Sequence, residues 1–91
     1  MKSERVKKAL IILNHYDTKN QKMKVCEELS ELETALLKHI NKGDNTEDVL
    51  EEMADVYIML EQLKYMMPFG ENRLDEMIDS KLDRQIQRIK G

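Results

Sequence analysis

The sequence NQKMKVCEELSELETALLKHI, residues 20–40, carries the pattern that decides the fold. Thr18-x-x-Gln21, which overlaps its start, has the form of a capping box and predicts a helix that begins at Thr18. Gly43 predicts the end of that helix, because glycine readily adopts the backbone conformation that follows a last helical turn. The apolar residues between these two points recur every three or four positions, as expected for one buried helix face: Val25, Leu29, Leu32, Leu36 and Ile40.

Helical periodicity continues outward on both sides of this segment. One helix is expected from about Ser3 to Leu13, a third is expected to be capped by Asn45-Thr46, and a fourth follows Glu71-Asn72. Because the joints are short, consecutive helices should run roughly antiparallel. The pattern predicts one all-α domain over residues 1–91, a four-helix, bundle-like fold. The residues expected to face inward are Val49, Met53, Val56, Leu60, Leu63 and Met67 in the third helix, and Leu74, Ile78, Leu82, Ile86 and Ile89 in the fourth.

Composition narrows the classes of protein that the chain can represent. With 91 residues, a single domain buries limited apolar surface, so self-association is expected to add stability. The net charge of −3 favours neither nucleic acid nor an anionic membrane as a partner. Cys26 is the only cysteine, which excludes an intramolecular disulfide, and its apolar surroundings predict a small core residue. With no expected signal peptide or membrane span, a cytoplasmic protein is predicted.

Two acidic pairs stand at the edges of the apolar faces. Glu28 and Glu31 are neighbours on the second helix, and Glu52 and Asp55 are neighbours on the third, because residues three apart share a helix face. If the two apolar faces pack together, both acidic pairs converge beside the seam, which is the line of contact between the second and third helices. Converging carboxylates repel one another unless cations compensate, and Mg²⁺ prefers oxygen ligands of this kind. The alternative is that both pairs are solvated, since glutamate is common on exposed helix faces.

The fourth helix carries a basic ridge beside its apolar face, formed by Lys81, Arg84 and Arg88. Such a ridge could hold phosphate groups. The alternative is electrostatic, because basic residues near a helix C-terminus also stabilise the helix dipole.

With these residues in view, the chain resembles the MazG family of nucleotide pyrophosphohydrolases. The resemblance rests on Glu28-x-x-Glu31 followed by Glu52-x-x-Asp55, in the context EELSEL and EDVLEEMADV, and covers roughly residues 16–63. KLDRQIQRIK is a weaker match to the basic C-terminal helix of the family. The resemblance implies a MazG-type all-α fold, a homodimer or homotetramer, and Mg²⁺-dependent hydrolysis of an NTP or dNTP to the monophosphate and pyrophosphate, with Mn²⁺ as a substitute metal.

The resemblance also implies roles for individual residues. Glu28, Glu31, Glu52 and Asp55 would bind the metal, and either Glu28 or Glu31 would orient the attacking water or accept its proton. Lys81 and Arg84 would contact the substrate phosphates. The competing interpretation is a non-catalytic helical module that oligomerises or binds a partner helix, which the methionine-rich third helix would also suit: Met53, Met59, Met66 and Met67.

Overall fold

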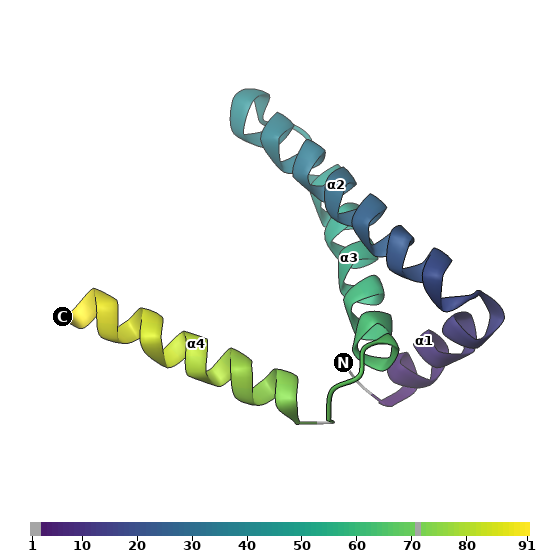
Figure 1. The fold of residues 1–91 in the computed structure, drawn as a ribbon. Coiled ribbons are helices and arrows are strands. Elements are labelled where there is room, and N and C mark those ends of the chain that lie inside the picture. Colours follow the sequence, from purple (N-terminus) through teal and green to yellow (C-terminus); the bar gives the residue numbers. More distant parts are fainter. Residues whose placement is uncertain (1–2, 71) are drawn as a thin grey trace.

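The computed structural model describes residues 3–70 and 72–91 and contains four helices, with no strand in the described residues. The all-α class predicted from the sequence is confirmed. Glu71, which the sequence placed in the last joint, lies outside the described residues. Figure 1 shows the four helices, which are α1 (Ser3–His15), α2 (Thr18–Lys42), α3 (Thr46–Met66) and α4 (Arg73–Lys90).

Helices α2 and α3 form the central hairpin of the molecule (Figure 1). The joint between them is short because Gly43 and Asp44 both adopt a left-handed backbone, with φ of 70° and 61°. The Gly43 N–H donates to the carbonyl oxygen of His39 at 2.9 Å and ends α2 where the sequence predicted. Asn45 Nδ2 donates to the carbonyl oxygen of Ala35 at 2.9 Å and ties the joint back to α2.

The starts of α2 and α3 differ from the capping expectations. Asp17, rather than Thr18, is the N-cap of α2, and its carboxylate accepts a 2.9 Å hydrogen bond from the backbone N–H of Asn20. The predicted capping box is therefore wrong, and Gln21 is buried instead of closing the cap. Asn45 does occupy the N-cap position of α3, but its side chain makes no capping hydrogen bond there.

The core between α2 and α3 is small and unusually polar. Val25, Val56 and Met59 are its buried apolar residues, while α1 contributes Ala9 where it packs against α3. Much of the apolar face predicted for α2 lies open, since Ile40 is 69% exposed. The residues of the predicted α2 and α3 faces that are exposed are Leu29, Leu36, Ile40, Met53, Leu60 and Met67. Cys26 is also exposed, which corrects its expected place in the core.

Helix α4 extends away from the other three helices (Figure 1) and buries no side chain. Its apolar residues were expected to face inward, but Ile78, Leu82, Ile86 and Ile89 are exposed. The Cα radius of gyration is 15.8 Å, against about 12 Å for a compact domain of this length. The four helices are therefore present, but only three of them pack together within one chain.

Helices in the described part of the chain are too polar or too short to cross a membrane.

Candidate metal centre

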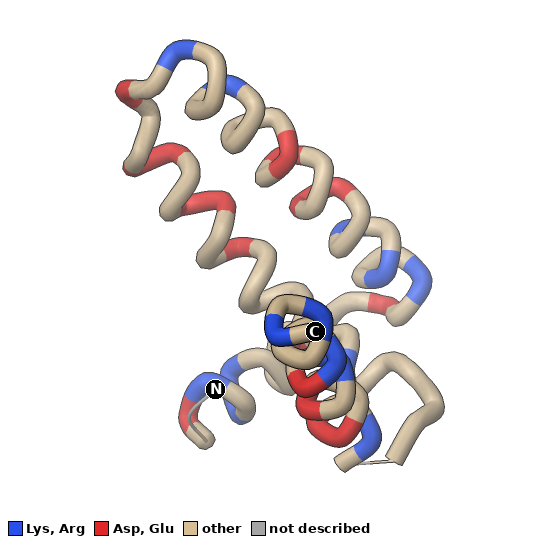
Figure 2. Tube along the Cα trace, turned by 90° about the vertical axis from the view of Figure 1, so that its left-hand side faces the viewer, with Lys and Arg blue, Asp and Glu red and all other residues tan. Residues whose placement is uncertain are grey.

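Three of the four predicted metal ligands meet where α2 and α3 pack together. Carboxylate oxygens of Glu28, Glu31 and Glu52 all lie within 4.8 Å of one another. The two glutamates of α2 are one helical turn apart, and α3 brings Glu52 against them from the other side of the seam. Figure 2 shows the acidic segments that run along both helices of the hairpin.

Two oxygens of this cluster are buried without a partner in the part of the chain that the structure describes. They are Glu28 Oε2 and Glu52 Oε2. Glu28 is only 6% exposed, whereas Glu31 is exposed and Glu52 is half-buried. A buried carboxylate oxygen normally accepts a hydrogen bond or binds a cation, because leaving it unpaired costs desolvation energy. These two oxygens therefore suit a cation that both glutamates could share.

The electrostatics of the cluster affect Glu52 most clearly. Desolvation raises the pKa of its carboxyl above the usual 4.5, and the neighbouring charges of Glu31, Asp55 and Glu28 raise it further. A divalent cation would reverse this effect, since it favours the ionised carboxylate.

Lys24 supplies part of the missing positive charge. Its Nζ lies 3.1 Å from Glu28 Oε1 and 3.5 Å from Glu27 Oε2. The hydrogen-bonded pair with Glu28 is the main cause of the raised pKa of the Lys24 ammonium. The ammonium occupies one oxygen of Glu28 and leaves the other, Oε2, unpaired.

Asp55 stands beside the cluster rather than within it. It is exposed and is absent from the group of three carboxylates within 4.8 Å. It lines a cavity of about 390 Å³ together with Glu28 and Lys24. Glu31 and Glu52 line a second cavity of about 350 Å³ at the other end of the cluster. The carboxylates thus stand between two solvent-accessible hollows that could admit a cation and a polar ligand.

The structure does not bring the predicted phosphate contacts to this cluster within one chain. Lys81 and Arg84 are exposed residues of α4, which extends away from α2 and α3 (Figure 1). Their proposed contact with substrate stays a prediction.

Two features of the site were not predicted from the sequence, and the first is a pair of buried amides beside the acidic cluster. Gln21 Nε2 donates a 2.7 Å hydrogen bond to Gln62 Oε1, and both residues line the same cavity as Glu28 and Asp55. Helical spacing could have indicated both residues, because Gln21 is one turn before Val25 and Gln62 one turn after Met59.

The second feature is the ion pair of Lys24, although its spacing of four from Glu28 is typical of such pairs.

The donor set of the cluster consists of carboxylate oxygens alone. Such ligands suit hard cations such as Mg²⁺ or Mn²⁺ and do not suit metals that require thiolate or imidazole ligands. Comparison of the chain with protein-family models, curated proteins and solved structures found no match.

Proposed function

We propose that this chain is a Mg²⁺-dependent nucleoside triphosphate pyrophosphohydrolase of the MazG type, acting as a homodimer or homotetramer. The observation that carries the proposal is the meeting of Glu28, Glu31 and Glu52, with two buried oxygens that lack a partner in residues 3–70 and 72–91. The motif spacing that resembles the MazG family adds the reaction class. The products would be the nucleoside monophosphate and pyrophosphate.

The three clustered glutamates would hold the metal, and Asp55, which lines the adjoining cavity with Glu28, would complete its ligand set. When bound, Mg²⁺ supplies neutralising charge at the phosphoryl oxygens and lowers the pKa of a coordinated water. Exposed Glu31 is accessible to solvent, while buried Glu28 forms an ion pair with Lys24. Either carboxylate could orient the attacking water or accept its proton.

Cationic groups must offset the charge that develops on the departing pyrophosphate. Lys24 lines the cavity beside Glu28 and Asp55, so it is the nearest such candidate within the hairpin. Within one chain, α4 extends away from the acidic cluster (Figure 1). Lys81 and Arg84 therefore remain candidates only if α4 takes another position in an assembled protein.

The decisive experiment measures pyrophosphate release from a panel of NTPs and dNTPs, with Mg²⁺, with Mn²⁺ and with EDTA. We expect metal-dependent release with a matching amount of monophosphate. Glu52→Gln should abolish turnover, whereas the matched control Glu51→Gln should retain it, because Glu51 is exposed and outside the cluster. Turnover that survives Glu52→Gln would refute the proposed site.

A second candidate function is a non-catalytic module that binds a partner helix. The exposed apolar residues of α4 favour it, since a surface of this kind usually contacts another protein. A binding module would tolerate simultaneous neutralisation of Glu28 and Asp55 and would release no pyrophosphate from any member of the panel. An enzyme would lose both metal binding and turnover in the same double variant.

A further inference from the structure

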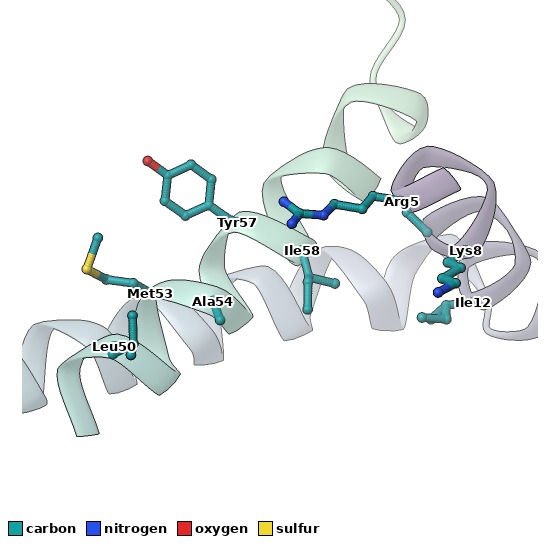
Figure 3. Close-up of a pocket in the computed structure, with 9 residues that line it drawn as sticks. Arg5, Lys8, Ile12, Leu50, Met53, Ala54, Tyr57 and Ile58 are labelled. Carbon is teal, nitrogen blue, oxygen red and sulfur yellow. The ribbon is translucent and has the colours of Figure 1, made fainter. Parts of the chain in front are cut away.

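An apolar groove lies between α1 and α3 (Figure 3). Its volume is about 650 Å³, and it lies on a different face of α3 from Glu52. Leu50, Met53 and Tyr57 form its α3 side, and Tyr57 is 62% exposed. Arg5 and Lys8 of α1 line the groove near its Ile58 end (Figure 3). The hairpin therefore presents an open apolar surface with a basic wall.

Helix α4 presents the complementary surface. Its apolar residues share one face at helical spacing and are exposed along the length of the helix. Asp75, Asp79 and Asp83, spaced four apart, form an acidic edge beside this face. Lys81 and Arg84 lie on the opposite edge.

We propose that two copies of this chain exchange α4, so that α4 of each copy occupies the α1–α3 groove of the other. The exchange covers two apolar surfaces that one chain leaves open, and a two-fold axis repeats each contact. It also sets the acidic edge of α4 against Arg5 and Lys8 of the partner groove. This assembly requires no nucleotide chemistry, so the α4 exchange is tested separately from pyrophosphate release, although it shares with the proposed function the expectation of a homo-oligomer.

Charge and register favour a second copy over the helix of the same chain. If α4 folded back along its own α3, equal helical rise would place about residues 81–89 against residues 50–58. That part of α4 contains three basic residues, Lys81, Arg84 and Arg88, and one acidic residue, Asp83. It would therefore bring net positive charge to the basic wall. The α4 helix of a partner copy is not restricted to this register, so its acidic first half can dock against the basic wall.

The contact is large enough for a specific dimer. An 18-residue helix is about 27 Å long, and docking one apolar face along a groove buries several hundred Å². Two reciprocal dockings reach on the order of 1,000 Å², which is near the lower limit for a specific protein interface.

The first test measures the mass of the full chain in solution by light scattering or native mass spectrometry, without nucleotide. We expect a dimer or a multiple of it, rather than the 10.8 kDa monomer. Ile78→Asp should raise the dimer dissociation constant at least about tenfold. The matched control Ser80→Asp, on the opposite face of α4, should leave it unchanged. A monomeric chain, or equal effects of the two variants, would overturn the exchange.

The second test identifies the chain from which the docked helix comes. In a Cys26→Ser background, Ala54→Cys protein is mixed with differently tagged Ile78→Cys protein and treated with a short bismaleimide. We expect a cross-linked product that contains both tags, whereas Ser80→Cys in place of Ile78→Cys should give little. If instead the double variant Ala54→Cys/Ile86→Cys, which the fold-back register places together, links only within single chains, α4 folds back and the proposal fails. A dimer that does not link these positions in any combination also overturns it.

Discussion

Replacing Gln62 with leucine tests whether the buried amide pair holds the α2–α3 seam together. Gln62 is 1% exposed, and its Oε1 accepts the 2.7 Å hydrogen bond from Gln21 Nε2 across the seam. Leucine keeps much of the side-chain volume but leaves the Gln21 amide unpaired, which costs about 1–3 kcal/mol. For a domain of this size, the loss corresponds to a decrease in Tm of roughly 5–20 °C.

The assay is thermal and urea unfolding followed by circular dichroism at one fixed protein concentration, because self-association makes Tm depend on concentration. The double variant Gln21→Leu/Gln62→Leu should recover much of the loss, because both buried polar groups are then removed together. We expect a coupling energy of about 1–2 kcal/mol between the two positions. Gln87→Leu on exposed α4 serves as the control. A single variant within about 0.5 kcal/mol of wild type, or strictly additive effects, would refute this account of the seam.

Three further results are expected. Glu52→Gln should raise the Tm of the metal-free protein near neutral pH, because folding raises the pKa of this carboxyl and thus disfavours its charged form. This increase in Tm should shrink as the pH falls through the folded-state pKa toward 4.5, where wild-type Glu52 is also neutral. Melting curves measured over a series of pH values test this, and a difference in Tm that does not depend on pH would contradict it. Lys24→Met should tighten Mn²⁺ binding by up to about fivefold in calorimetric titrations, since the ammonium that competes for Glu28 is lost; weaker binding would mean that Lys24 positions the carboxylate instead. Cys26 should react with a thiol reagent in the folded protein about as completely as in denaturant, because it is exposed, and protection from the reagent would contradict this placement.

The sequence predicts the helices well because each has its own apolar periodicity and end signals. Convergence of Glu28 with Glu52 could also be predicted, since both border the faces that pack in a short-jointed hairpin. Whether these residues bind a metal stays a prediction, because helical spacing brings carboxylates together without naming the ion that joins them.

Other features were predicted wrongly or not at all, each for a different physical reason. Asp17 and Thr18 are both capable N-caps, and only the backbone geometry selects Asp17. Cys26 adjoins the buried Val25, but one residue turns the side chain by about 100° around the helix and into solvent. Gln21 was overlooked as a core residue because a count of apolar positions passes over a polar side chain that finds a buried partner.

The unpartnered position of α4 was also beyond prediction. Periodicity identifies the apolar face of a helix, but it does not say whether the same chain or another molecule covers that face.

The helical hairpin that brings Glu52 against Glu28 and Glu31 also limits where the chain between them can vary in length. A residue inserted within α3 before Glu52 would rotate the rest of the helix by about 100° and advance it by about 1.5 Å. Either Glu52 would turn away from Glu28, or the buried face of α3 would leave the seam. A residue added to the joint itself could be absorbed as a wider loop. Between Glu31 and Glu52, length changes compatible with the acidic cluster should therefore be confined to residues 43–45, where the chain reverses direction.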